Sequence, residues 1–162
     1  MPTSSDKIVS PRALEQLRKS WRQQDKVVVF TNGCFDLLHR GHVEFLREAR
    51  GLGDLLLVGL NSDDSVRALK GAGRPLVPQQ DRAQLLAELN SVDYISIFDE
   101  ISVESTVAAI LPDILVKGGD YELDQIVGRE VVEQNGGRVR SLLFWGDRST
   151  TGLIAKAREL DP

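Results

Sequence analysis

The sequence predicts a single α/β domain built on a doubly wound parallel sheet of five strands, with helices on both faces of the sheet. Short apolar segments alternate along the chain with segments whose apolar residues recur every three or four positions. The short segments are apolar at nearly every position, which is typical of strands buried on both faces by covering helices. Alternating strands and helices form βαβ units, so the strands are expected to run parallel.

Each element can be placed from this alternation. The strands are expected at 27–30, 55–60, 94–98, 113–116 and 139–145. The helices are expected at 11–24, 42–52, 62–70, 80–89, 102–111, 126–134 and 150–160, the first of them inside a helical leader over residues 1–25. Ser10 before Pro11 reads as a helix start, as does Ser62, because serine caps the first turn and proline fits its first position.

Length and composition fit one domain over residues 1–162, with 41% hydrophobic residues and a core large enough to fold without disulfides or a structural metal. The single cysteine excludes an internal disulfide, and no Cys/His cluster indicates a zinc site.

A net charge of −4 argues against nucleic-acid binding, which needs a basic face. No apolar stretch is long enough to cross a bilayer, and the first residues lack a signal-like core. We therefore expect a cytoplasmic protein with neither nucleic acid nor membrane as partner.

Both histidines of the chain follow the first strand, in the string TNGCFDLLHRGH at 31–42. Ligands of doubly wound sheets bind beyond the carboxyl ends of the strands, where the strand order reverses. His39 and His42 stand there at a helix start, whose N–H groups attract phosphate, and Gly41 allows a phosphate to approach the backbone. Imidazoles at this place can donate hydrogen bonds to phosphoryl oxygens in a transition state. We therefore favour a catalytic role for both over capping and packing.

Three cations lie in or beside a Gly-Pro loop of this acidic chain, namely Lys70, Arg74 and Arg82. Each alone would be read as a solvated surface charge, but together they are suited to neutralising a triphosphate. The segment 71–75 is expected to be a mobile loop, because its glycines flank charged residues. There is no GxxxxGK[ST] string, which argues against a P-loop kinase.

The string at 31–42 contains an HxGH signature and resembles the nucleotidylyltransferase superfamily, whose Rossmann-like α/β proteins join a nucleoside monophosphate to a phosphate or carboxylate. The full string, together with LPDILVKGGDY at 111–121 and STTGLI at 149–154, resembles the heptose-phosphate adenylyltransferases. Members of that family occur alone or as the second half of a bifunctional heptokinase. The resemblance covers nearly the whole chain after about residue 25.

This resemblance implies transfer of AMP from ATP to D-glycero-β-D-manno-heptose 1-phosphate, giving ADP-heptose and pyrophosphate for lipopolysaccharide inner-core assembly. It implies Mg²⁺ carried by ATP rather than by a dedicated protein site, and a homodimer or higher homo-oligomer. The alternatives are a cytidylyltransferase for glycerol 3-phosphate or another polyol phosphate, and a nucleotide sensor without catalysis. The cytidylyltransferases carry Arg-Thr-Glu-Gly where this chain has FWGDR at 144–148, which weakens that alternative and leaves Arg148 without a role.

The site residues can then be assigned. His39, His42 and Lys70 are expected to be catalytic. The nucleotide is expected to contact Thr31, Asn32, Gly33, Cys34, Phe35, Gly41, Lys117, Gly118, Gly119, Ser149, Thr150 and Thr151. The acceptor is expected to contact Asp36, Arg74, Arg82 and Asp120, although Asp36 fits equally well as a brace of its own turn. Cys34 is a weak candidate nucleophile, since a small buried residue in a turn is the commoner role.

Overall fold

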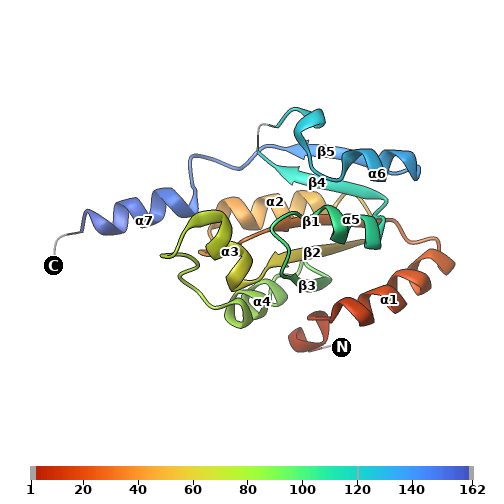
Figure 1. The fold of residues 1–162 in the computed structure, drawn as a ribbon, viewed down its shortest axis with the longest axis horizontal. Helices are drawn as coiled ribbons and strands as arrows, with labels where there is room; N and C mark the ends of the chain where they lie inside the picture. Colours follow the sequence, from red (N-terminus) through yellow and green to blue (C-terminus); the bar gives the residue numbers. More distant parts are fainter. Residues whose placement is uncertain (1–2, 120, 161–162) are drawn as a thin grey trace.

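The computed structural model describes residues 3–119 and 121–160, and over these residues the chain folds around one parallel sheet (Figure 1). The strands are β1 (Val28–Gly33), β2 (Leu55–Asn61), β3 (Tyr94–Phe98), β4 (Ile114–Gly118) and β5 (Arg138–Leu142). The α-helices are α1 (Pro11–Gln23), α2 (Arg40–Arg50), α3 (Asp63–Lys70), α4 (Gln79–Ala87), α5 (Glu104–Ile110), α6 (Arg129–Gln134) and α7 (Thr150–Arg158). Short 3₁₀ helices occupy Ser4–Lys7 and Leu123–Gln125. The predicted Rossmann-like α/β class is confirmed.

The strand order is β3-β2-β1-β4-β5, with every neighbouring pair parallel. The chain moves outward from β1 to β3 and then crosses back to place β4 on the other side of β1. The order therefore reverses between β1 and β4, and their carboxyl ends, Gly33 and Gly118, lie at this switch point. Open α/β sheets bind their ligands at such a place.

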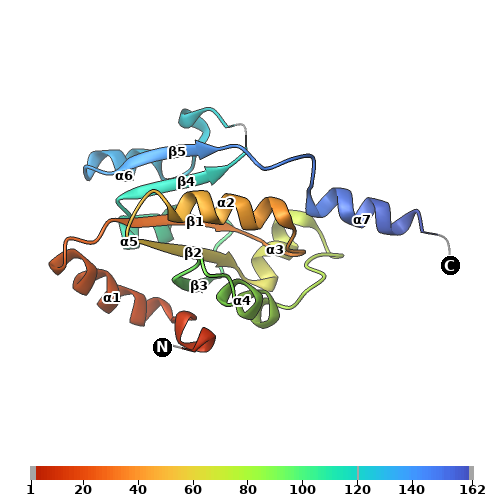
Figure 2. The same cartoon turned by 180° about the vertical axis from the view of Figure 1, so that it is seen from behind.

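Apolar side chains on the two faces of the sheet form two core clusters. Phe30 and Leu57 belong to the cluster that α1, α5 and α6 cover, whereas Val29 and Val58 belong to the cluster that α2 and α4 cover. Successive residues of a strand point to opposite faces, so continuous apolar strands supply both cores. The two faces can be compared in Figures 1 and 2.

The predicted helix starts are confirmed by their hydrogen bonds. The Ser10 hydroxyl accepts from the N–H of Ala13 at 3.2 Å, and the Ser62 hydroxyl accepts from the N–H of Ser65 at 3.2 Å. Each bond satisfies a donor that has no partner within the helix. Each cap joins residues that are only three positions apart, which is why the sequence alone located it.

Several element boundaries differ from the predictions by a few residues, among them the first strand, which continues to Gly33 rather than ending at residue 30, and two of the differences shape the carboxyl edge of the sheet. The last strand ends at Leu142 rather than at residue 145, because the Phe144 ring leaves the sheet and packs over Gly118. The helix predicted from residue 126 begins only at Arg129, after Gly128, which has a φ of 90° that a helix cannot hold. Both differences put apolar side chains, including Phe144 and Ile126, at the carboxyl edge of the sheet rather than inside an element.

Helix α7 extends away from the sheet (Figures 1 and 2), and none of its residues is buried. Its first residue is tied to the body of the protein, since the Thr150 hydroxyl donates to the carbonyl of Leu37 at 3.1 Å. The start of α7 therefore lies near the start of α2.

Candidate active site

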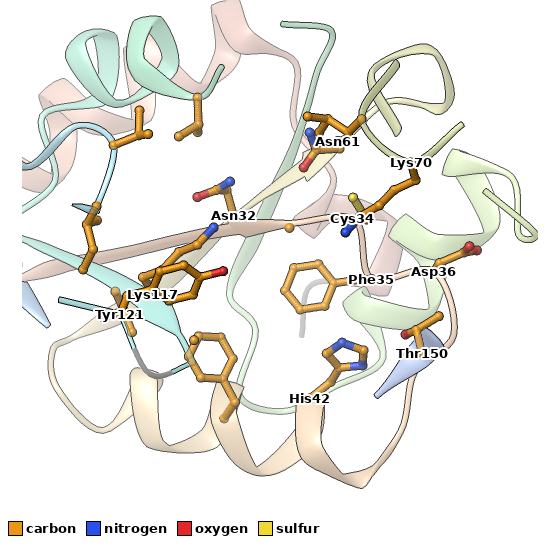
Figure 3. A pocket seen from close by; sticks show the side chains of 18 of the residues that line it. Asn32, Cys34, Phe35, Asp36, His42, Asn61, Lys70, Lys117, Tyr121 and Thr150 are labelled. Atoms are coloured by element: carbon orange, nitrogen blue, oxygen red, sulfur yellow. The ribbon is translucent and has the colours of Figure 1, made fainter. Parts of the chain in front are cut away.

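A cavity of about 590 Å³ opens at the carboxyl edge of the sheet, at the switch point between β1 and β4 (Figure 3). Twelve of the predicted site residues line it, namely Asn32, Gly33, Cys34, Phe35, Asp36, His42, Lys70, Arg74, Lys117, Gly118, Thr150 and Thr151. They come from the ends of β1 and β4, from the starts or ends of α2, α3 and α7, and from the loops after β1 and α3. Residues from distant parts of the sequence are thus gathered around one space.

Other predicted site residues are not brought to the cavity wall: Thr31, His39, Gly41, Arg82, Gly119 and Ser149. Asp120 lies outside the described residues. Thr31 is buried within β1, and Ser149 acts as the N-cap of α7, where its hydroxyl accepts from the N–H of Gly152 at 2.9 Å.

The two histidines stack at the start of α2, with ring centroids 3.8 Å apart, and His42 faces the cavity. His42 Nδ1 accepts a hydrogen bond from the backbone N–H of His39 at 3.4 Å. Burial, and then the neighbouring His39, lower the pKa of His42 to about 4. The ring is therefore neutral at pH 7, and with Nδ1 accepting it carries its proton on Nε2 as a donor.

His39 lies behind His42 and outside the cavity wall. Burial, and then the charge of Arg148, lower the pKa of His39, so this ring is also biased toward its neutral form. A Cβ atom at Gly41 would lie 2.9 Å from the His39 ring, so the glycine makes room for this ring. Binding of nucleotide by Gly41 stays a prediction.

Asp36 braces the loop that follows α3. Its carboxylate accepts from the N–H groups of Leu76 and Val77, each at 2.9 Å, and pairs with Arg74 Nε at 2.7 Å. Burial opposes ionisation, but these hydrogen bonds outweigh it and lower the pKa of the Asp36 carboxyl. Asp36 thus braces the loop at 74–77 rather than its own turn, which was one of the two interpretations left open, and its contact with the acceptor stays a prediction.

Arg82 is 0% exposed and takes part in the architecture beneath the cavity. Its guanidinium donates to the carbonyls of Cys34, Asn61 and Val77 and pairs with Asp63 at 2.8 Å. The guanidinium therefore joins the ends of β1 and β2 to α4, and its predicted contact with the acceptor stays a prediction.

Two lysines provide positive charge to the cavity wall. Lys70 ends α3 and Lys117 lies near the end of β4. Burial lowers the pKa of Lys117. Burial also raises the pKa of the Cys34 thiol, which favours its protonated form and disfavours it as a nucleophile.

The sequence reasoning missed several lining residues, including the buried Asn61 and the aromatic Phe45, Tyr121 and Phe144. The signal for Asn61 was present, because a polar residue closes the apolar run of β2. Phe144 had been placed inside a strand, so its contact with Phe45, at 5.7 Å between ring centroids, could not be foreseen.

Among the described residues, no group of three or more His, Cys, Asp or Glu side chains could hold a metal ion. The carboxylate that lines the cavity, Asp36, is occupied by Arg74 and two backbone N–H groups. In the same part of the chain, no helix has the length and apolar character needed to cross a membrane.

A Rossmann-like sheet with a histidine donor, two lysines and the first residues of two helices at its switch point defines a nucleotidyltransferase class of protein. Comparison with known sequences agrees: the chain belongs to the cytidylyltransferase-like family, whose model matches residues 30–150.

Among curated proteins, the chain is 52% identical over 157 residues to the bifunctional protein HldE of Geotalea uraniireducens, covering 97% of this chain and 32% of that protein. It is 56% identical over 135 residues to the bifunctional protein HldE of Geobacter sulfurreducens, covering 83% of this chain and 28% of that protein. The chain thus spans about a third of the length of these relatives.

Solved structures agree on the fold. The lipopolysaccharide core biosynthesis protein of Thermoplasma volcanium is 30% identical, with a TM-score of 0.61 over 74% of this chain and 97% of that one. The pantoate-beta-alanine ligase of Francisella tularensis has a TM-score of 0.64 over 90% of this chain and 69% of that one, at 14% identity, and it supports the fold alone.

Proposed function

We propose that this chain transfers AMP from ATP to D-glycero-β-D-manno-heptose 1-phosphate, giving ADP-heptose and pyrophosphate. The observation that carries the proposal is the neutral His42 at the start of α2, facing a cavity that lysines and the start of α7 also line. The sugar comes from the resemblance of the strings at 31–42 and 111–121 to heptose-phosphate adenylyltransferases. The relative from Thermoplasma volcanium, named for lipopolysaccharide core biosynthesis, supports the same pathway.

In the proposed reaction, a phosphate oxygen of the acceptor attacks the α-phosphorus of ATP, a P–O bond forms there, and the bond to the β-phosphate bridging oxygen breaks. The acceptor phosphate is already nucleophilic, so the protein contributes positioning and charge stabilisation. His42 Nε2–H would donate to an α-phosphoryl oxygen as charge develops, and Lys70 would neutralise the phosphates. Thr150 and Thr151, at the start of α7, are suited to β- and γ-phosphate oxygens.

We propose that Mg²⁺ enters with ATP and is held by phosphates and waters, which is the usual preference of this ion. It would neutralise charge on the departing pyrophosphate. Because ATP is the proposed donor, we also place the reaction in the cytoplasm.

The test is release of pyrophosphate with ATP or CTP against a panel containing heptose 1-phosphate, other sugar 1-phosphates and glycerol 3-phosphate. We expect kcat/KM for ATP to exceed that for CTP by about ten-fold to a thousand-fold, because a site that pairs adenine leaves polar groups unpaired with a pyrimidine. Equal values or a preference for CTP would contradict the adenylyl assignment. A preference for glycerol 3-phosphate would favour the polyol-phosphate cytidylyltransferase, and binding without turnover would favour a sensor.

A further inference from the structure

Asn61 and Asn32 place two amides on one face of the sheet, at the carboxyl ends of β2 and β1. Asn32 pairs in register with Gly59, and Asn61 lies two residues beyond Gly59 on the same strand. Because side chains alternate between faces, both amides share the face of Phe30 and Leu57, which α5 covers. His42 and Phe45 belong to α2, which covers the opposite face. The cavity therefore has contributions from both sides of the sheet edge.

The position of Asn61 is fixed by its main chain. Its carbonyl accepts from the buried Arg82 Nη1 at 2.9 Å, and its strand neighbour in β3 is Phe98. The residue is 3% exposed and lines the cavity. Among the described residues, its side-chain amide makes no hydrogen bond with the protein; the bond to Arg82 uses the main-chain carbonyl. The amide atoms themselves are not fully buried, so they meet the solvent of the cavity, where a polar group of a bound ligand can take the place of water.

The chemistry of the amide indicates what this partner is. An amide offers both a donor and an acceptor, as does a hydroxyl group, whereas phosphate oxygens only accept. Figure 3 shows Asn61 and Lys70 toward one side of the cavity and Lys117 and Tyr121 toward the other. The aromatic Tyr121, which Figure 3 shows on the side opposite Asn61, provides flat surface for a base, as does Phe144, which also lines the cavity. Asn61 therefore lies on the side opposite Tyr121, where the hydroxyl groups of a second substrate can meet its amide.

We infer that Asn61 is a specificity-determining residue that hydrogen-bonds a hydroxyl group of the acceptor sugar. The inference rests on the proposed function, in which the acceptor is a sugar phosphate. It assigns the acceptor sugar to the α5 face of the sheet edge, and it leaves the α-phosphate beside His42 on the α2 face.

The experiment compares the full chain with Asn61→Leu, which keeps similar volume and loses the amide, and with Asn61→Asp, which keeps the shape and loses the donor. Asn90→Leu is the matched control, since Asn90 is exposed and lies outside the cavity wall. For Asn61→Leu we expect kcat/KM for the sugar phosphate to fall by about ten-fold to a hundred-fold. The Kd of ATP, measured by calorimetry without acceptor, should change by less than about two-fold, and the control should match the wild type.

A second measurement distinguishes the loss of sugar recognition from a change in packing around residue 61. Acceptors that lack one hydroxyl group should be poorer substrates for the wild type, and for one of these positions the difference should disappear in Asn61→Leu, as in a double-mutant cycle. If Asn61→Leu does not fold, as judged by its melting curve, the same comparison is made with Asn61→Asp. A parallel loss of ATP affinity, an unchanged kcat/KM for the acceptor, or a discrimination that persists at every hydroxyl position overturns the inference.

Failure of the proposed function would give a different experimental result from failure of the Asn61 inference. If the wild type prefers another polyol phosphate or CTP, the proposed function is wrong, and the Asn61 comparison is carried out with that acceptor and decides the inference. If the wild type uses no acceptor that carries hydroxyl groups, both are overturned.

Discussion

His42 combines a neutral ring with a position in the cavity wall, so its substitution should affect the chemical step. We expect His42→Ala to lower kcat by about 10²–10³, which is the usual effect of losing a donor used in the transition state. His39→Ala should also lower kcat, since its ring stacks on His42, although the backbone N–H that donates to His42 Nδ1 is retained in this variant. The measurement is single-turnover transfer together with ATP affinity, which should change far less than kcat. Near wild-type turnover in both variants would contradict the catalytic assignment.

The lowered pKa of His42, about 4, links this residue to the stability of the protein. Unfolding returns the pKa toward about 6.5, so between these values the unfolded chain binds a proton that the folded chain does not. Stability contributed by the neutral ring is therefore present above about pH 6.5 and is lost as the pH falls toward 4. We expect the free energy of unfolding to fall by about 2 kcal/mol from this group between pH 7 and pH 5. Denaturant unfolding of the wild type and His42→Asn checks this, and equal pH dependence in both would contradict it.

At the scale of elements, the loop after α3 is held by Asp36 at its far end, whereas its near end makes only the bond from the Gly71 N–H to the Arg67 carbonyl at 2.9 Å and the turn bond from the Arg74 N–H to the Gly71 carbonyl at 3.1 Å. Cβ positions at Gly71 and Gly73 would meet no atom within 4 Å, whereas Asp36 binds Arg74, Leu76 and Val77. We expect fast amide exchange at 72 and 73 without nucleotide and protection when ATP binds, as for a closing lid. Exchange measured by mass spectrometry with and without ATP tests this, and identical exchange in both states would contradict it.

The hydrogen bonds that Asp36 makes to this loop can be tested with a matched variant. Asp36→Asn retains the shape of the side chain and removes the charge that pairs with Arg74. We expect exchange at Leu76 and Val77 to rise by about ten-fold or more, because hydrogen bonds to a charged group are worth about 1.5–3 kcal/mol. Arg67→Gln is a suitable control, since Arg67 forms an exposed pair with Asp64 outside the cavity.

At the scale of the whole molecule, we predict a homodimer, because two-fold pairing is the commonest soluble assembly and the family resemblance implies a homo-oligomer. Helix α7 has no buried residue, and apolar side chains on it and on the preceding loop are exposed, including Leu143 and Trp145 at 69% and 49%. Such a surface favours contact with another protein surface. Light scattering at tens of micromolar should give the mass of a dimer, and Leu153→Asp, on α7, should shift it toward a monomer. A monomeric wild type would contradict the prediction.

The sequence by itself determined the order of strands and helices, the parallel sheet and the helix starts at Ser10 and Ser62. These features depend on the period of apolar residues and on hydrogen bonds over three or four positions, so neighbouring residues are sufficient to specify them. Local patterns also predicted that His42 lies at a helix start after the first strand, and the cavity is found there.

Only the tertiary structure decided which polar residues face the cavity. Lys70 and Arg82 looked alike in the sequence, yet Lys70 lines the cavity while Arg82 is buried. Arg82 is tied to carbonyls from the ends of β1 and β2, and Asp36 is tied to a loop forty positions further along the chain. The burial of a charge depends on partners that the fold brings from distant segments, and no periodicity along the chain reports them. For the same reason the polar residue that closes the apolar run of β2, Asn61, is identified as a site residue only because β2 ends beside β1, the strand that borders the switch point.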